Sequence, residues 1–365
     1  MGSCDDTALG KAPYVRRRLR AWYRRNARDL PWRRATGNAD DHAYRTWLSE
    51  IILQQTRIDQ GMPYYDRFIE AYPRIEDLAA ASEDDILKLW EGLGYYTRAR
   101  NLHRCAKVVV EAHEGRIPQA CEALQRLPGI GRYTACAISS IVFGERVAVV
   151  DGNVTRVLSR LFNIESAIED RATANRLWRL ADALVPGRSP GDHNQAMMEL
   201  GARICLPKAP QCAGCPIRKE CDAFEAGVQE QRPVRRPRKR TPHHEVVVAV
   251  IKKKGRYLLG KRPAKGLLGG LWEFPGGKVN PGETHHEALE REVREELGIR
   301  VKPGKLIATV NHAYSHFRVT LNVYACTHVA GKPQANSHVE VKWVPKSHFP
   351  RYAFPKANHR FLDLL

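Results

Sequence analysis

The chain has 365 residues and a formal net charge of +19, and hydrophobic residues make up 43% of it. This is an ordinary globular composition for about two or three domains, and no apolar run approaches the roughly 18 residues that a membrane-spanning helix needs. The excess of 59 lysines and arginines over 40 aspartates and glutamates favours nucleic acid as the partner, although a solubility role or an acidic protein partner would also account for it.

The first predicted element is a helix over residues 14–28. Its apolar stripe is formed by Val15, Leu19, Trp22 and Tyr23, and arginines cover the rest of its surface. An arginine-rich amphipathic start could also be a transit peptide, but the segment runs directly into DLPWRR without a cleavage signature. We therefore interpret it as the first helix of the fold, and we find no apolar core of a secretory signal.

The pattern stays helical as far as about residue 225 and changes after a linker. Residues 226–245 carry three prolines and a dense basic run, which is typical of a linker, either a solvated tether or one that also touches phosphates. We expect a multidomain protein with an all-α domain at 1–225 and an α+β domain at 246–365. The predicted elements of the second domain are two strands around a Lys-Gly turn at 245–262, a helix at 283–298, and strands at 305–310, 317–326 and 338–345.

A short glycine-rich turn, LPGIG at 127–131, joins two of the predicted helices. Gly129 and Gly131 allow backbone angles that other residues avoid, and the following helix begins with free N–H groups that point outward. Such a turn can hold a DNA phosphate without reading the base sequence. A plain corner between two helices would use the same glycines.

Two carboxyl groups suggest an acid–base pair. Glu50 lies on a predicted helix among apolar neighbours, which raise the pKa of a carboxyl group and can keep it protonated near neutral pH. Asp151 lies at the start of another helix, where the anion is favoured. One neutral acid and one anion are what cleavage of a glycosidic bond requires, whereas each residue alone would be an ordinary surface glutamate or helix cap.

Four of the nine cysteines lie close together. Cys205, Cys212, Cys215 and Cys221 give the spacing C-x6-C-x2-C-x5-C, which can hold zinc or an iron–sulfur cluster, and the spacing favours the cluster. The other five are scattered, namely Cys4, Cys105, Cys121, Cys136 and Cys326. We therefore expect a metal centre in a reducing compartment rather than disulfides.

A second motif spans Gly277 to Ile299 and follows the pattern G-x5-E-x7-R-E-U-x-E-E-x-G-U, in which U is aliphatic. Glu292, Glu295 and Glu296 would share one face of the predicted helix, where they could gather Mg²⁺ or form a solvated acidic edge. The motif resembles the Nudix box, and the complete match predicts a Nudix fold for the second domain.

The set LPGIG, VDGNV and the four-cysteine loop resembles the helix-hairpin-helix superfamily of DNA glycosylases, with a 4Fe-4S cluster at 205–221. Within it, LPWR, WLSEIILQQT, GLGYYTRARNLH and NQAMMELGARIC resemble the MutY family, whose members remove adenine mispaired with 8-oxoguanine. The resemblance covers nearly the whole chain. It implies an intracellular, DNA-associated enzyme, cytoplasmic if bacterial, that acts as a monomer on double-stranded DNA with adenine opposite 8-oxoguanine.

The resemblance also implies roles for three residues. Bifunctional members of the superfamily carry an attacking lysine at the position of Tyr133, and a phenol with a pKa of about 10 is a poor nucleophile at neutral pH. The chain therefore resembles a monofunctional glycosylase, which leaves the DNA strand intact. In this family Glu50 would protonate adenine, Asp151 would stabilise the sugar cation, and Tyr133 would hydrogen-bond nearby.

Further positions match family residues that handle a base flipped out of the duplex. Gln55 and Tyr95 match the residues that wedge into the duplex, Gln195 the one that contacts adenine, and Trp32 and Arg33 the pocket wall. A core aromatic residue is the alternative for Tyr95.

The second domain of the MutY family reads 8-oxoguanine, and NHAYSHF resembles its recognition loop, with Tyr314, Ser315 and His316 in place. The family's Nudix box is usually degraded, whereas the box here is intact, which leaves open bound Mg²⁺ or nucleotide hydrolysis. Three alternatives remain: a lyase-type glycosylase for oxidised pyrimidines, a nucleotide pyrophosphohydrolase, and a DNA-binding module without catalysis.

Overall fold

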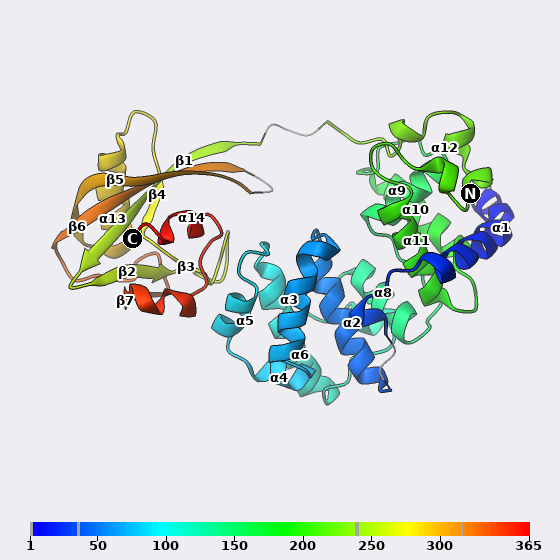
Figure 1. Cartoon of the computed structure of the whole chain (residues 1–365), viewed down its shortest axis with the longest axis horizontal. Coiled ribbons are helices and arrows are strands. Elements are labelled where there is room, and N and C mark those ends of the chain that lie inside the picture. Colours follow the sequence, from blue (N-terminus) through cyan, green and yellow to red (C-terminus); the bar gives the residue numbers. More distant parts are fainter. Residues whose placement is uncertain (1–2, 35–36, 238–240, 315–316) are drawn as a thin grey trace. The chain divides into compact units, whose positions relative to one another are not determined.

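The computed structural model describes residues 3–34, 37–237, 241–314 and 317–365 (Figure 1). The chain forms two compact units, one from residues 1–79 and 104–238 and the other from residues 80–103 and 239–365. No helix within the described ranges combines the length and the apolar character that crossing a membrane requires.

The described residues of the first unit form helices and connecting loops and no strands, as the spacing of apolar residues predicts. Its helices are α1 (Ser3–Asn26), α2 (Ala39–Leu53), α3 (Ile58–Ala71), α4 (Ile75–Ala80), α7 (Cys121–Leu124), α8 (Arg132–Val142), α9 (Gly152–Leu161), α10 (Arg171–Leu184), α11 (Pro190–Arg203) and α12 (Asp222–Glu225), and α6 (Thr97–His113) enters it from the second unit. Short 3-10 turns are η1 (Pro31–Arg33), η2 (Cys212–Gly214), η3 (Arg218–Glu220) and η4 (Gln229–Gln231).

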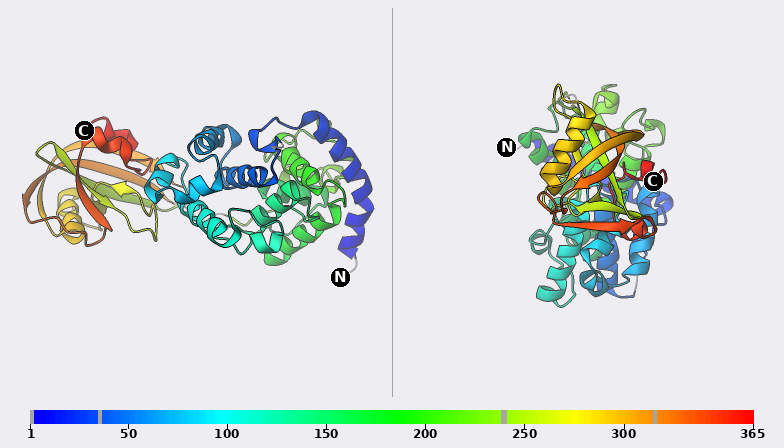
Figure 2. Two further views of the ribbon diagram at one scale, coloured as in Figure 1. Left: turned by 90° about the horizontal axis from the view of Figure 1, so that it is seen from below. Right: turned by 90° about the vertical axis from the view of Figure 1, so that its left-hand side faces the viewer.

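Helix α1 confirms the predicted first helix, although it begins at Ser3 and not near residue 14. Val15 and Leu19 are fully buried, and they pack with apolar residues of α9, α10 and α11 into one core. Figure 2 shows α1 in blue along the green helices of this core. The apolar stripe is therefore the buried face of α1, as its helical spacing predicts.

The glycine-rich turn lies between α7 and α8, where it was predicted. Gly129 adopts a positive φ of 74°, which favours glycine, and Gly131 is the N-cap residue of α8. Two cysteines from the scattered group also meet here, because the Sγ atoms of Cys121 and Cys136 lie 2.6 Å apart. The turn brings α7 back against α8, which explains why residues fifteen positions apart become neighbours.

The predicted linker at 226–245 is only in part a tether. The fully buried Arg160 donates through Nε to the carbonyl oxygens of Gln229 and Arg232, at 2.7 and 3.1 Å. Ile168 donates its backbone N–H to the carbonyl of Val234 at 3.1 Å. The start of the basic segment is therefore anchored on the helical unit, and its last residues already belong to the first strand of the second unit.

The second unit includes residues 80–103, which the sequence pattern assigns to the helical domain. They carry α5 (Glu83–Leu89) and the start of α6. Glu91 accepts a hydrogen bond from the backbone N–H of Phe354 at 2.6 Å and pairs with His359 at 3.0 Å. Burial opposes ionisation of Glu91, but these partners and Lys88 hold its pKa below the ordinary value.

The rest of the second unit is an α+β domain, as predicted. Its strands are β1 (His243–Lys253), β2 (Arg256–Lys261), β3 (Trp272–Glu273), β4 (Gly276–Lys278), β5 (Arg300–Ala313), β6 (Arg318–Ala330) and β7 (Glu340–Pro345), and its sheet order is β3-β2-β1-β6-β5, with β4 paired to β1 and β7 to β2. The predicted hairpin is confirmed, since β1 and β2 are joined through Lys254 and Gly255, both with positive φ. The remaining elements are η5 (Lys346–Arg351) and α14 (His359–Leu362).

Helix α13 (His285–Leu297) carries the Nudix-box glutamates and lies against the sheet (Figure 2). Thr284 and Glu287 form a capping box at its start, and Gly298 ends it in the left-handed conformation. The apolar face of α13 packs on β1 and β5 through Ala288 and Leu289, which are fully buried. Local sequence therefore fixes both ends of this helix.

Candidate active site

Glu50 and Tyr133 meet where α2 packs against α8. Glu50 lies in the last turn of α2 and Tyr133 in the first turn of α8, and the Tyr133 hydroxyl donates to Glu50 Oε2 at 2.6 Å. The neighbouring Ile51 and Ile52 are buried, whereas Glu50 and Tyr133 are only partly buried. The carboxyl group therefore sits among apolar side chains but stays within reach of a ligand.

Burial raises the pKa of Glu50 to about 7, and the charge of Asp151 adds to this rise while the hydrogen bond from Tyr133 opposes it. Burial also raises the pKa of Tyr133, together with the negative charges of Glu50 and Asp151. The phenol therefore stays protonated and remains a donor. A carboxyl group that titrates near neutral pH can both hold a proton and release it.

Asp151 is the N-cap residue of α9, as predicted. Its Oδ1 accepts from the backbone N–H of Val154 at 2.7 Å, and its Oδ2 accepts from the Asn153 side chain at 3.0 Å. The helix terminus does not decide the ionisation alone, because burial raises the pKa of Asp151 in spite of these hydrogen bonds. The hydrogen bonds are still specific to the carboxylate form, which they stabilise.

Arg33 is held beside this cluster by a glutamate that the sequence patterns do not single out. Glu199 on α11 is fully buried, and it accepts hydrogen bonds from Arg28 at 2.6 Å and from Arg33 at 3.0 Å. The two guanidinium groups hold the pKa of Glu199 below its ordinary value despite burial. A glutamate amid the apolar letters of NQAMMELGARIC is the signal that could have identified it.

The other two expected pocket residues lie on neighbouring elements. Trp32, in η1, is buried and packs edge-on against Tyr65, with ring centroids 4.9 Å apart. Gln195 lies one turn before Glu199 on α11 and is partly exposed. The Tyr133 hydroxyl is also 3.5 Å from the sulfur of Met198, which places this stretch of α11 beside the Glu50–Tyr133 pair.

The two expected wedge residues share an unusual backbone conformation. Gln55, two residues after the end of α2, has φ 56°, and Tyr95, two residues before the start of α6, has φ 50°. A non-glycine residue in this region costs on the order of 1–3 kcal/mol, and such residues cluster at functional sites. Tyr95 is 37% exposed, so it is not the core aromatic residue that the alternative interpretation predicts.

Gly131 faces open space. A Cβ atom built on this glycine would meet no described atom within 4 Å, outside its own neighbours in the chain. Packing within the unit therefore does not require glycine at this position. Room in front of the α8 N-terminus is what close approach of a phosphate needs.

The four clustered cysteines converge around one small cavity. Cys205, Cys212, Cys215 and Cys221 line it together with Arg160, whose Nη1 donates to the Cys205 sulfur at 3.2 Å. Among the described residues, only one group of three or more potential metal ligands has its ligand atoms within 4.8 Å of one another, and that group lies in the second unit. No three of these four sulfurs are therefore that close together. Four sulfurs around one zinc ion would be about 3.8 Å apart, because Zn–S bonds are about 2.3 Å long. The wider arrangement suits a multi-iron cluster.

A cavity of about 410 Å³ lies beside the expected recognition loop in the second unit. Tyr314 lines it and stacks on Phe317, with ring centroids 4.7 Å apart. Ser315 and His316 lie outside the described residues. Burial raises the pKa of Tyr314 to about 12, which keeps its hydroxyl protonated.

Two of the three glutamates of the Nudix box, Glu292 and Glu296, line the cavity beside Tyr314. Arg291 pairs with Glu292 at 2.8 Å and with Glu295 at 3.4 Å, whereas Glu296 has other partners. Arg291 is the arginine of the box itself, so these ion pairs form within the motif, and binding of Mg²⁺ by the glutamates stays a prediction.

Glu296 instead lies with Glu273 and His338, and each offers a ligand atom within 4.8 Å of the others. Burial raises the pKa of Glu296 to about 7, and the charge of Glu273 adds to the rise. Arg262 pairs with Glu273 at 2.6 Å and already supplies positive charge there. Sheet pairing creates this cluster, and no local pattern in the sequence could have indicated it.

Comparisons with known proteins agree with both domains. Residues 48–183 match the HhH-GPD superfamily of base excision DNA repair proteins, and residues 246–364 match the NUDIX domain. The chain is 38% identical over 362 residues to the adenine DNA glycosylase of Mus musculus, a match that covers 85% of this chain and 70% of that protein. The chain belongs to the adenine DNA glycosylase family.

The chain has relatives in the adenine DNA glycosylase family from distantly related organisms. The chain is 34% identical over 302 residues to the adenine DNA glycosylase of Buchnera aphidicola subsp. Acyrthosiphon pisum, which covers 82% of this chain and 83% of that protein. A thermostable thymine-DNA glycosylase of known structure is 32% identical with a TM-score of 0.53, and the match covers 60% of this chain and 98% of that one. These findings confirm the expected glycosylase fold followed by a Nudix-like domain.

Proposed function

We propose that this protein removes adenine from double-stranded DNA where adenine lies opposite 8-oxoguanine, by hydrolysis of the N-glycosidic bond. The observation that carries the proposal is the Glu50–Tyr133 pair, in which a carboxyl group with a pKa of about 7 lies beside a second, hydrogen-bonded carboxyl group, Asp151. This is the arrangement of acid and anion that glycosidic cleavage needs.

In the proposed reaction Glu50 gives its proton to a ring nitrogen of the flipped-out adenine. The C–N bond then breaks, its electron pair stays with the departing base, and the Asp151 carboxylate stabilises the positive charge that develops on the sugar. Water supplies the hydroxyl group that ends on the sugar carbon, and the proton that this water loses returns to the Glu50 carboxylate. Tyr133 keeps Glu50 in place and offers no amine, so no Schiff base with the sugar forms and the strand is not cut.

Binding of the duplex is proposed to use features of both units. The hairpin at Gly129 and Gly131 and the excess positive charge would hold phosphates, and Gln55 and Tyr95 would enter the base stack. In the second unit, the cavity beside Tyr314 would take the 8-oxoguanine.

The test compares two duplexes that differ only in the base opposite adenine. We expect faster single-turnover release of adenine opposite 8-oxoguanine than opposite guanine, and we expect Tyr314→Ala to narrow the difference. The strand should stay intact until it is treated with alkali, and borohydride should trap no protein–DNA adduct. Equal rates on both duplexes would contradict the specificity, and a trapped adduct would favour the lyase alternative.

The rate of adenine release should fall as the pH rises through about 7, because Glu50 must be protonated to act and its pKa lies there. Above that value we expect a loss of about tenfold for each pH unit, since the protonated fraction falls by that factor. Single-turnover rates between pH 5 and pH 9 on the 8-oxoguanine duplex would measure it. A rate that stays constant across this range would remove Glu50 from the role of acid.

We also propose that the four cysteines hold a 4Fe-4S cluster, which would fasten the 205–221 loop to Arg160 and α9. Purified protein should then contain about four irons per chain and little zinc, and Cys215→Ser should lose the iron and melt at a lower temperature. Cys326→Ser, in the second unit, is the control and should keep the iron. Stoichiometric zinc, or iron retained in Cys215→Ser, would contradict the cluster.

A further inference from the structure

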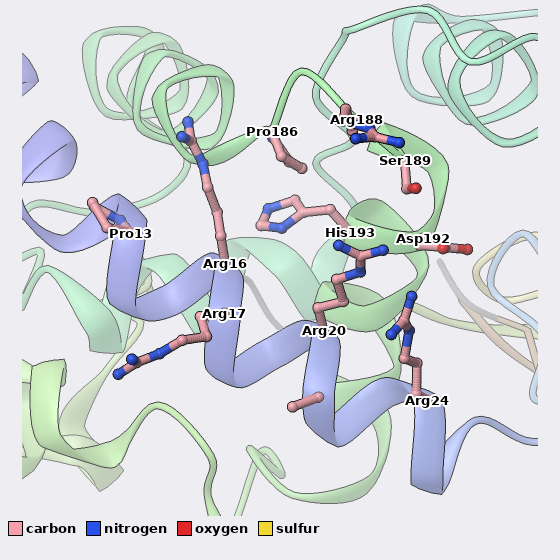
Figure 3. Close-up of a pocket in the computed structure, with 11 residues that line it drawn as sticks. Pro13, Arg16, Arg17, Arg20, Arg24, Pro186, Arg188, Ser189, Asp192 and His193 are labelled. Carbon is pink, nitrogen blue, oxygen red and sulfur yellow. The ribbon is translucent and has the colours of Figure 1, made fainter.

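A cavity of about 470 Å³ opens between α1, the turn at 186–189 and the start of α11 (Figure 3). It is lined by five arginines and a single acidic residue, namely Arg16, Arg17, Arg20, Arg24, Arg188 and Asp192, together with His193. None of these residues belongs to the active site described above.

The positive charge in this cavity is not neutralised by the protein. Arg16, Arg20 and Arg24 are spaced by four residues, so they share one face of α1, and Figure 3 shows them rising on the side of His193. Like charges at this spacing repel by about 0.2–0.5 kcal/mol per pair. Within the described part of the chain, Arg20, Arg24 and Arg188 have no acidic partner within ion-pair distance.

Arg16 is fixed in place by the backbone. Its guanidinium group donates to the carbonyl oxygens of Ala183, Leu184 and Val185, at 2.9, 2.9 and 3.1 Å, where α10 ends. These contacts orient the side chain without cancelling its charge. One arginine of the cavity is thus already positioned before any ligand arrives, which lowers the entropy lost on binding.

His193 is the most unusual residue in the cavity. It is only 8% exposed, its ring points into the cavity in Figure 3, and no described group hydrogen-bonds to that ring. Its ring nitrogens reach solvent through the cavity, so a ligand bound there can accept a hydrogen bond from the ring. Burial and the charge of Arg16 lower the pKa of His193 to about 4, and the neutral ring keeps one N–H to donate.

The N-terminus of α11 adds to the positive potential in the cavity. The helix runs for 14 residues from Pro190, and its N-terminus, which carries partial positive charge, faces the cavity through Asp192 and His193. The cavity therefore combines a fixed arginine, arginines without an acidic partner, a ring N–H and a helix N-terminus, and such groups bind phosphate in proteins.

We propose that this cavity binds a small phosphate-bearing anion. Its hollow shape, closed on three sides by α1, the 186–189 turn and α11, suits a compact molecule better than a duplex backbone. The apolar Pro13, Ala21 and Pro186 also line it and could contact an organic part of the ligand. The proposal does not depend on adenine excision.

Titration calorimetry of the whole protein with inorganic pyrophosphate tests the site. We expect saturable binding that weakens by about tenfold or more in Arg20→Gln/Arg188→Gln, because two charge-assisted hydrogen bonds to the phosphate oxygens are lost. The exposed pair Arg116→Gln/Arg171→Gln removes the same charge elsewhere and should bind as the wild type does. His193→Gln should also weaken binding.

A second measurement, of affinity for undamaged duplex DNA, distinguishes a site for a small ligand from a contact with the DNA backbone. Affinity for undamaged duplex should change equally in the Arg20/Arg188 and Arg116/Arg171 pairs, because both lose two positive charges, and adenine release should persist in each. Pyrophosphate binding that is absent from the wild type, or unchanged in Arg20→Gln/Arg188→Gln, would overturn the proposal. A selective loss of duplex affinity in that variant without pyrophosphate binding would make the cavity a DNA contact instead.

Discussion

Glu50→Gln should lower the single-turnover rate of adenine release by about 10²–10⁴-fold, which is the usual contribution of a general acid. The amide is nearly isosteric and can still accept the hydrogen bond from Tyr133 that the carboxyl group accepts at 2.6 Å. It has no proton to give to a departing base. Binding of a duplex that contains the mismatch should therefore be retained while the chemistry is lost, as measured by release kinetics and by gel-shift titration on one preparation.

Glu50→Gln should also be more stable than the wild type at high pH. Because the pKa of Glu50 is raised in the folded protein from 4.5 to about 7, its contribution to stability is complete below about pH 4.5 and is lost as the pH rises through about 7. Glutamine keeps the neutral form at every pH, so Glu50→Gln should exceed the wild type at pH 8 by on the order of 1–3 kcal/mol in free energy of unfolding. This difference in free energy of unfolding should disappear at low pH, where Glu50 is neutral as well.

Glu111→Gln is the matched control, since Glu111 is exposed on α6 and has no role in the site. It should leave both the rate and the pH dependence of stability unchanged. If Glu50→Gln released adenine as fast as this control, Glu50 would not be the acid. If neither the wild type nor the control released adenine, the alternative of a DNA-binding module without catalysis would be favoured.

The parts of the fold that depend on neighbouring residues were predictable from the sequence. The helix predicted at 283–298, the hairpin through Lys254 and Gly255, and the stripe of α1 each arise from residues close together in the chain, and all three were found. The capping box and Gly298 explain where that helix begins and ends. The site residues Glu50 and Asp151 could be picked out because each breaks a local pattern, a carboxyl group among apolar letters or at a helix start.

What the sequence could not supply were contacts between residues far apart in the chain. Tyr133 reaches Glu50 across 83 positions, and Glu199 meets Arg33 across 166. The grouping of residues 80–103 with the second unit depends on partners such as Phe354 for Glu91, more than 260 positions away. Periodicity predicts which face of an element is buried, but it does not identify the side chain that a buried carboxyl group will meet.

Asp151 shows how a local rule can be outweighed. A helix N-terminus favours the anion, yet burial raises the pKa of Asp151 even with two hydrogen bonds to its carboxylate. The depth of the site decides the direction of the pKa shift, and that depth is set by the packing of α9 against α11 and α10 rather than by the VDGNV motif. Water screens the charge of a buried carboxylate less than that of an exposed one. A buried carboxylate therefore stabilises a sugar cation more strongly.

Asp151→Asn should therefore reduce adenine release by about 10²–10³-fold, the loss expected when one electrostatic stabiliser of a transition state is removed. Asparagine caps a helix about as well as aspartate, so the backbone N–H of Val154 keeps an acceptor and the melting temperature should change little. Asp151→Ala should lose the same activity and about 1 kcal/mol of stability as well, because the cap is gone. Comparing the two variants by release kinetics and thermal unfolding separates charge from capping.

Asp170→Asn is the control for this pair, since Asp170 is the N-cap residue of α10 and its substitution removes the same charge from a helix start outside the active site. It should release adenine at the wild-type rate. If Asp151→Asn kept the wild-type rate while Asp151→Ala lost it, the role of Asp151 would be that of a cap alone. The sugar cation would then need another anion, and Glu50, once it has given up its proton, is the nearest carboxylate that the site offers.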